Sequence, residues 1–157
     1  MRPHHIAGSP TTRDAPPLEA ISEGVVGPFE VELVSGPDAP MAARAALRAW
    51  MAGHVGVTIL SDAELLVAEL VGNSVRHADA AADAAISVRA HLRPDALCLD
   101  VGDRGMSGSI SRRAPDLERG GGFGLNVVEV LSRRWGVHRD AGTHVWAELA
   151  FRNEAER

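Results

Sequence analysis

The sequence predicts an α+β domain, a two-layer sandwich whose mixed but mostly antiparallel sheet carries its helices on one face. Three observations lead to this class. Short runs alternate apolar and polar residues, as half-buried strands do, and longer runs repeat apolar residues at helical spacing. Their order is strand, helix, helix, hairpin, long loop, helix, hairpin, which favours antiparallel pairing. At 157 residues the chain is long enough for one domain with a sizeable core.

The chain divides into a leader, a folded domain and a short tail. Residues 1–27 are rich in Pro, Ala, Gly and Ser without apolar periodicity, which predicts a disordered leader. The domain is predicted over 28–152, and 153–157 form the tail. No apolar run approaches the roughly 20 residues that span a bilayer, and no secretory signal is recognisable. With a single Cys98, which excludes an intramolecular disulfide, we expect a cytoplasmic protein.

The first elements are a strand and an amphipathic helix. Apolar residues alternate with glutamates over 29–33, which predicts a half-buried strand. The stretch from Asp38 to His54 carries apolar residues at helical spacing. Arg44 and Arg48 lie one turn apart on another face of this predicted helix.

A second helix is predicted from Ser61 to Ala78. Ser61 and Glu64 match a capping box, in which each side chain satisfies a free backbone N–H at a helix start. The residues that follow are strongly apolar, as in a helix buried on most of its surface.

A polar stripe runs through this second helix. Glu69, Asn73 and His77 are spaced four residues apart, so they lie above one another on one helical face. An acid, an amide and an imidazole on a mostly buried helix are costly unless they are paired or bound. The stripe therefore predicts a site.

The rest of the chain supplies a hairpin, a long loop, a helix and a second hairpin. The first hairpin is predicted over 86–101 with its turn at Pro94-Asp95. A loop as long as 102–122 inside a compact domain is usually functional. The remaining elements are predicted at 125–134 (helix), 135–139 (strand) and 143–151 (strand).

Two missing residue types exclude whole classes of function. The chain has no lysine, so its 16 basic residues are all arginine. A Walker A loop and Schiff-base chemistry both require lysine and are excluded. Phosphates would have to be bound by backbone N–H groups, arginines or a metal. With no tyrosine and a net charge of −5, nucleic-acid binding is also disfavoured.

Two glycine-containing motifs suggest ligand contacts. The stretch Gly120-Gly121-Gly122-Phe123-Gly124 leads directly into a helix, whose free N–H groups and dipole attract anions. Asp103-Arg104-Gly105 follows a strand, where the carboxylate could accept a hydrogen bond from an exocyclic amine and Gly105 would let a flat ring approach. Taken alone, each motif also fits an ordinary loop or turn.

The helical stripe offers chemistry for phosphoryl transfer. Mg²⁺ prefers oxygen ligands, and Asn73 can provide a carbonyl oxygen. Glu69, one turn earlier, could take a proton from an attacking hydroxyl or water. The competing interpretation places Glu69 and His77 on a solvated seam with Asn73 capping a loop.

Taken together, these motifs resemble those of the Bergerat-fold (GHKL) ATPases. The matching segments are AELVGNSVRHA, LDVGDRG, GGFGLNVVEVLSRRWGV and GTHVWAEL, and the resemblance as a whole covers about Pro28 to Phe151. The chain is most similar to the small anti-sigma-factor serine/threonine protein kinases. The resemblance implies the Bergerat α/β sandwich with an ATP lid, here from about Arg104 to Gly121.

The resemblance also implies a role for each matching residue. Asn73 would hold Mg²⁺ against the ATP phosphates, and Glu69 would be the general base. Asp103 would bind the adenine amino group, with Gly105 beside the ring and Thr143 supporting that contact. The remaining nucleotide-binding positions are His77, Gly122, Gly124 and Leu125.

We therefore expect an ATP- and Mg²⁺-dependent regulatory protein of the anti-sigma-factor type. It would phosphorylate a serine or threonine of a protein antagonist and sequester a partner such as a sigma factor. It would contact neither nucleic acid nor membrane, and the resemblance is compatible with a homodimer. The alternative is a nucleotide-responsive binding module without significant kinase turnover, and a third interpretation is a degenerate domain that binds no nucleotide.

Overall fold

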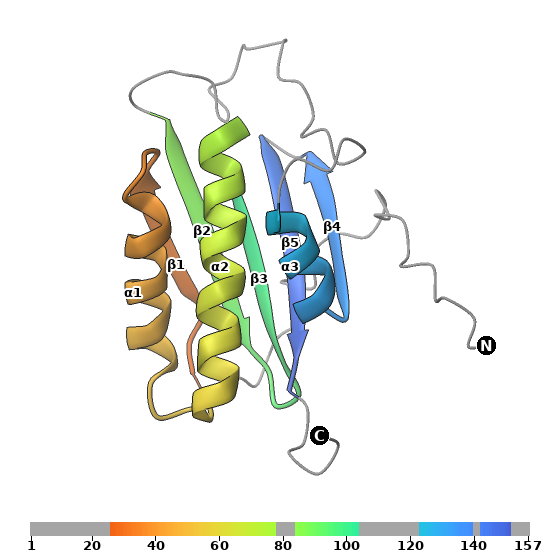
Figure 1. Ribbon diagram of the computed structural model, residues 1–157. Coiled ribbons are helices and arrows are strands. Elements are labelled where there is room, and N and C mark those ends of the chain that lie inside the picture. Colours follow the sequence, from red (N-terminus) through yellow and green to blue (C-terminus); the bar gives the residue numbers. More distant parts are fainter. Residues whose placement is uncertain (1–25, 78–83, 104–122, 140–141, 152–157) are drawn as a thin grey trace, which may run out of the picture.

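The computed structural model describes residues 26–77, 84–103, 123–139 and 142–151. They form two layers, a five-stranded sheet and a layer of helices on one of its faces (Figure 1). The elements in chain order are β1 (Phe29–Val34), α1 (Ala39–Met51), α2 (Val57–His77), β2 (Ala85–Leu92), β3 (Ala96–Asp103), α3 (Phe123–Leu131), β4 (Arg134–Arg139) and β5 (Thr143–Ala150). The predicted α+β sandwich is confirmed.

The strands lie in the order β1-β2-β3-β5-β4, and every neighbouring pair among the described strands is antiparallel. The sheet predicted as mixed therefore contains no parallel pair in these residues. β5 lies between β3 and β4, which leaves β1 and β4 at the edges. Both predicted hairpins form. At the turn of the first, the N–H of Arg93 donates to the carbonyl of Ala96 at 2.8 Å.

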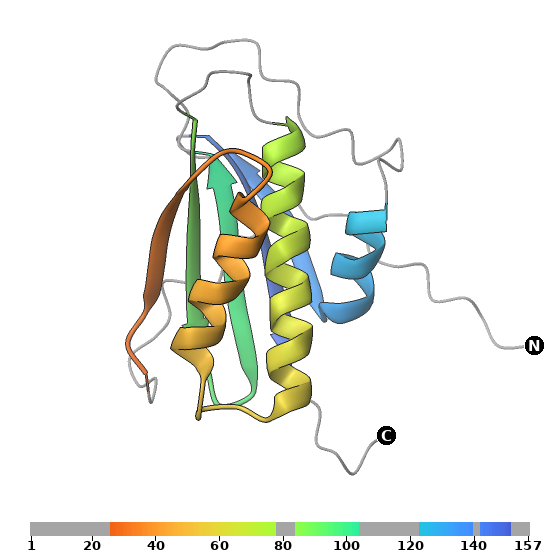
Figure 2. The ribbon, with the colours of Figure 1, turned by 60° about the vertical axis from the view of Figure 1, so that its left-hand side comes forward.

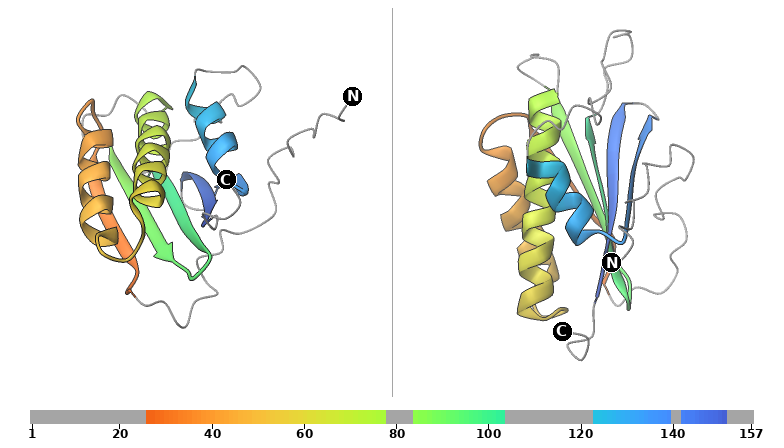
Figure 3. Two further views of the ribbon diagram at one scale, coloured as in Figure 1. Left: turned by 60° about the horizontal axis from the view of Figure 1, so that its bottom comes forward. Right: turned by 45° about the vertical axis from the view of Figure 1, so that its right-hand side comes forward.

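The two faces of the sheet differ sharply. On the helix side, one row across the sheet consists entirely of valines: Val31, Val88, Val101, Val145 and Val137. Successive residues of a strand point to opposite faces. The intervening residues therefore point away from the helices, to what we call the outer face. Figure 3 shows that α1, α2 and α3 all cover the same side.

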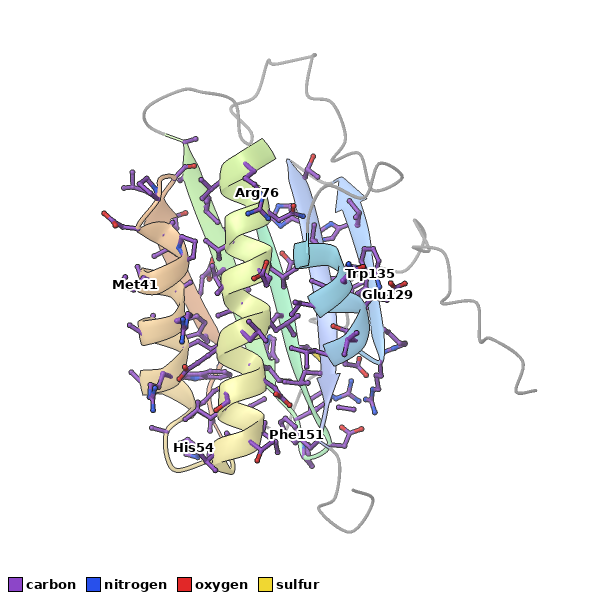
Figure 4. All side chains as sticks on the ribbon, viewed as in Figure 1. Met41, His54, Arg76, Glu129, Trp135 and Phe151 are labelled. Carbon is purple, nitrogen blue, oxygen red and sulfur yellow. The ribbon has the colours of Figure 1, made fainter. Side chains whose placement is uncertain are left out.

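The core lies between the sheet and the helices. α1 contributes Ala39, Ala43, Leu47 and Met51, all buried, at the helical spacing that the sequence predicted. Met41 points away from the core and is 72% exposed (Figure 4). α2 is packed against α1, β3 and α3, so it is the central helix of the layer (Figure 2).

The capping box predicted at Ser61 and Glu64 is wrong. α2 begins at Val57, so Ser61 is an exposed residue within the helix. Glu64 instead faces α1, where its carboxylate lies 3.5 Å from a guanidinium nitrogen of Arg44 and 3.1 Å from one of Arg48. The two arginines lie one turn apart on α1 and reach the same acid, so an interhelical contact replaces the predicted cap.

Some predicted segments fall outside the described residues. These are the leader up to residue 25, the lid from about Arg104 to Gly121, and the tail at 153–157. Among the helices that are described, none combines the length and apolarity needed to cross a membrane.

Candidate functional site

The elements predicted to carry the site converge at one end of the domain. α2 and β3 both finish at this end and β5 begins there, while α3 begins farther down, beside α2, with its first turn on the side of this end (Figures 1 and 2). Arg76, in the last turn of α2, marks this end in Figure 4. His54 and Phe151 mark the opposite end, where they line a separate pocket of about 330 Å³. Asp103 and Thr143 lie at the first end, Asn73 lies one turn before the end of α2, and Glu69 lies one turn earlier still.

Asn73 is the most buried member of the predicted stripe. Its residue is 7% exposed, on a helix that packs against both β3 and α3. Within the described parts of the chain, its side-chain amide makes no hydrogen bond. A buried polar side chain is stabilised by a hydrogen bond or a bound ligand. Glu69, one turn earlier, is half-buried, so its carboxylate has access to solvent.

Asp103 is the last residue of β3 and is 9% exposed. It lies on the same face of β3 as Val101, which faces α2 in the core. Its Oδ1 accepts a hydrogen bond from the backbone N–H of Thr143, at 3.1 Å. The Asp103 carboxylate is thus oriented by the first residue of β5, on the side of the sheet where Asn73 is buried.

The turn before Thr143 depends on a glycine. Gly142 has a φ of 131°, in the region that side-chain-bearing residues rarely adopt. This conformation leads the chain into β5 with the Thr143 N–H directed at Asp103. Gly142 and Thr143, the first two residues of the segment GTHVWAEL, therefore help to orient the Asp103 carboxylate.

α3 begins at Phe123, slightly earlier than predicted, so Gly124 and Leu125 lie in its first turn. Backbone N–H groups in a first turn have no partner within the helix, and the helix dipole makes them attractive to anions. Gly105 and Gly122 lie outside the described residues, as do the side chains of His77 and Leu125.

A second group of polar side chains, on the outer face, was not predicted. Asp100, His138 and His144 come from β3, β4 and β5 and contact one another. The strand alternation alone assigns Asp100 and His144 to the face opposite the core valines, so their shared face could have been predicted from the sequence. Their proximity depends on β5 lying between β3 and β4, which the sequence did not predict.

The pKa of Asp100 reflects its place in this group. Burial alone would raise the pKa, but hydrogen bonds from His144 and His138 outweigh it and hold the pKa below its ordinary value. Glu148, farther along the same face, behaves in the same way. Burial opposes ionisation, while hydrogen bonds from Arg134 and Arg133 lower its pKa overall. Both buried acids are therefore held in their charged form.

The fold and the convergent end define the class of protein. An antiparallel sheet with helices on one face is the arrangement of the Bergerat-type α/β sandwich that the sequence motifs predicted. The model of the histidine kinase-like ATPase domain matches residues 34–149, and the chain belongs to this family. No curated protein matches the chain at a significant level. Nucleotide binding is the property that this membership implies.

Proposed function

We propose that the domain binds ATP and Mg²⁺ at the end where α2, β3, α3 and β5 converge. We further propose that it is a serine/threonine protein kinase of the anti-sigma-factor type. It would phosphorylate a protein antagonist and sequester a partner such as a sigma factor. The observation that carries the proposal is the placement of two buried polar residues on the helix side of the sheet, Asn73 on α2 and Asp103 at the end of β3.

Phosphate binding has to rely on groups other than lysine, because the chain has none. The first turn of α3 offers backbone N–H groups at this end. Arg76 is exposed in the last turn of α2 and adds positive charge to the same end. These groups together suit a polyanionic ligand.

The residues present also fit a magnesium ion. Asn73 would provide its side-chain oxygen as a ligand, and oxygen is the ligand type that Mg²⁺ prefers. When bound, the ion neutralises negative charge on the phosphates. Asn73 gains the polar partner that it lacks among the described residues.

Asp103 would recognise the base. A carboxylate accepts hydrogen bonds only, so it suits the exocyclic amino group of adenine. Because the Thr143 N–H already donates to Oδ1, the carboxylate is held in one orientation. A group fixed before the ligand arrives loses less conformational entropy on binding.

Glu69 would act as the general base. Its half-buried carboxylate lies one turn before Asn73 and has access to solvent, from which a protein substrate arrives. It would take the proton from a serine or threonine hydroxyl as the new Oγ–P bond forms. The bond between the γ-phosphorus and the bridging oxygen breaks in the same step, and ADP leaves.

Phosphate transfer tests the kinase part of the proposal. Purified protein, labelled ATP and Mg²⁺ are incubated with candidate antagonist proteins, and phosphoserine or phosphothreonine is located by mass spectrometry. We expect transfer by the wild type and by Glu129→Gln, a matched change at an exposed site on α3. Glu69→Gln should lose about 10²–10⁴-fold in rate, the usual contribution of a general base.

Two results would contradict this assignment. Unchanged transfer by Glu69→Gln would show that Glu69 is not the base. ATP binding by the wild type without any phosphoprotein would favour the alternative, a binding module that responds to nucleotide without turnover.

A further inference from the structure

The outer face of the sheet carries a carboxylate and two imidazoles on three adjacent strands. His144 on β5 pairs in register with Gly102 on β3 and with His138 on β4. Asp100 lies on the same face of β3, two residues before Gly102. The antiparallel register thus gathers three side chains that are far apart in the sequence.

These side chains are already in contact. Nε2 of His138 lies 2.7 Å from Oδ2 of Asp100, and Nδ1 of His144 lies 2.7 Å from Oδ1. The two imidazole rings are stacked, with centroids 4.8 Å apart. One ligand atom from each residue can be chosen so that all three lie within 4.8 Å of one another.

The buried side chains of this group require polar partners. Asp100 is 2% exposed and His144 is 7% exposed. A buried carboxylate needs a cationic or hydrogen-bonding partner. In the described parts of the chain, Asp100 has its ion-pair contacts with the two imidazoles and none with a guanidinium. Arg89, its neighbour in register on β2, is paired with Glu30 instead.

A glycine creates the space for the group. A Cβ atom on Gly102 would lie 2.4 Å from both Cγ and Nδ1 of His144, which is too close for any real contact. The imidazole of His144 can therefore lie flat over β3 only because position 102 has no side chain. The arrangement is built into the sheet rather than being a chance meeting of surface residues.

We propose that Asp100, His138 and His144 form a binding site for a divalent transition-metal ion, with zinc as the ion that fits best. Two imidazole nitrogens and one carboxylate oxygen are a donor set that suits Zn²⁺. Mg²⁺ prefers oxygen ligands, so this site is chemically distinct from the proposed Mg·ATP site. It also lies on the opposite face of the sheet from α2.

The geometry requires only small movements. Ligand atoms at about 2.0–2.1 Å from a tetrahedral zinc lie about 3.3 Å from one another. The present N···O separations of 2.7 Å are those of hydrogen bonds, and the three ligand atoms lie within 4.8 Å of one another. Side-chain rotations would therefore have to open the two short separations and close the widest one to admit the ion. Half-buried His138, on edge strand β4, gives the ion its access.

A bound ion would stabilise this edge of the sheet. It would join β4 to β3 and β5 through side chains, in addition to the backbone ladder between β4 and β5. Three protein ligands leave a fourth tetrahedral position for water or another small ligand.

Zinc titration of the full chain tests the proposal. The protein is prepared without an affinity tag, and the leader histidines are changed (His4→Gln and His5→Gln) to remove an unrelated source of binding. We expect this parent to bind one zinc ion by calorimetry, and Co²⁺ to give the visible absorption of a tetrahedral site. Zinc should also raise its Tm with increasing concentration.

Matched variants locate the site. In the parent background, His138→Gln and His144→Gln should each weaken zinc binding by more than the roughly 10–100-fold that loss of an outer-shell partner costs. His91→Gln should leave the affinity unchanged, because His91 lies on the same face of β2, opposite Cys98, outside the group. His138→Gln is the variant best placed to stay folded, since His138 is half-buried on an edge strand.

Two outcomes would overturn the proposal. One is a folded parent protein that binds no zinc and gives no Co²⁺ spectrum, which would leave Asp100, His138 and His144 as a hydrogen-bonded structural group. The other is equal zinc affinity in the parent, His138→Gln and His144→Gln, which would place the ion elsewhere.

Discussion

The backbone N–H of Thr143 donates a hydrogen bond to Oδ1 of Asp103, at 3.1 Å. This contact joins the end of β3 to the start of β5, and Gly142, just before Thr143, has a positive φ. It fixes the orientation of a buried carboxylate at the end of the domain where the predicted nucleotide residues meet. The proposed recognition of adenine depends on that orientation.

Replacing Asp103 should weaken ATP binding more than it weakens the fold. Asp103→Asn keeps an oxygen that can accept from Thr143, but it loses the charge that would meet the adenine amino group. Because hydrogen bonds to charged groups are worth about 1.5–3 kcal/mol, ATP affinity should fall about 10–100-fold by calorimetry. Asp62→Asn, on α2 before the predicted site, is the control. Equal affinity in Asp103→Asn and the wild type would remove Asp103 from the site.

A methyl group at position 102 should disturb the outer face. In Gly102→Ala the new Cβ would meet the ring of His144, which Asp100 holds by a hydrogen bond. Overpacking of this kind usually costs about 1–3 kcal/mol, so the Tm should fall and zinc binding should weaken with it. Gly36→Ala is the matched control, because a Cβ there meets nothing within 4 Å. A Gly102→Ala protein as stable as Gly36→Ala would mean that His144 has room to move.

The free energy of unfolding should fall in acid as Glu148 becomes protonated. Hydrogen bonds from Arg134 and Arg133 hold its pKa below the ordinary 4.5 despite burial. Because the folded pKa is the lower one, this stabilisation is present above about pH 4.5 and is lost as the pH falls through the folded value.

Denaturant unfolding measured at several pH values tests this sign. Glu148→Gln should be less stable than the wild type by about 2 kcal/mol at neutral pH, since it loses hydrogen bonds between charged groups. Its stability should also change less between neutral and acidic pH. If the two proteins lose the same stability on acidification, the arginine contacts do not lower the pKa of Glu148.

Cys98 should react slowly in the native protein. It is buried on the outer face, and burial together with the charge of Glu148 raises the pKa of its thiol. Since the thiolate is the reactive form, alkylation at neutral pH should be much slower than in the same protein unfolded by denaturant. Mass spectrometry of timed samples measures both rates. Similar rates would show that the outer face opens readily.

The sequence predicted the elements well where local patterns decide them. The alternation of 29–33 and the amphipathic stretch before His54 both gave elements of the expected type. The capping box failed because Ser61 and Glu64 match it equally well inside a helix, and only the packing of α1 reveals that Glu64 meets Arg44 and Arg48.

The two candidate sites differ in how far the sequence could reveal them. The spacing of Glu69 and Asn73 along one helix is visible in the sequence, and Asn73 is buried in the structure. The meeting of Asp100 with His138 and His144 depends on strand order and register, which are set by tertiary packing. No local pattern reports that β5 lies between β3 and β4.

The central claim is that ATP binds beside Asn73, and thermal unfolding with and without nucleotide tests it most directly. Ligand that binds only the folded state raises the Tm with concentration. We predict that ATP with Mg²⁺ raises the Tm of the wild type and of Ser74→Ala, a change at the neighbouring position. In Asn73→Ala the rise should be lost or need far more ATP. No rise in the wild type, or an equal rise in Asn73→Ala, would contradict the account.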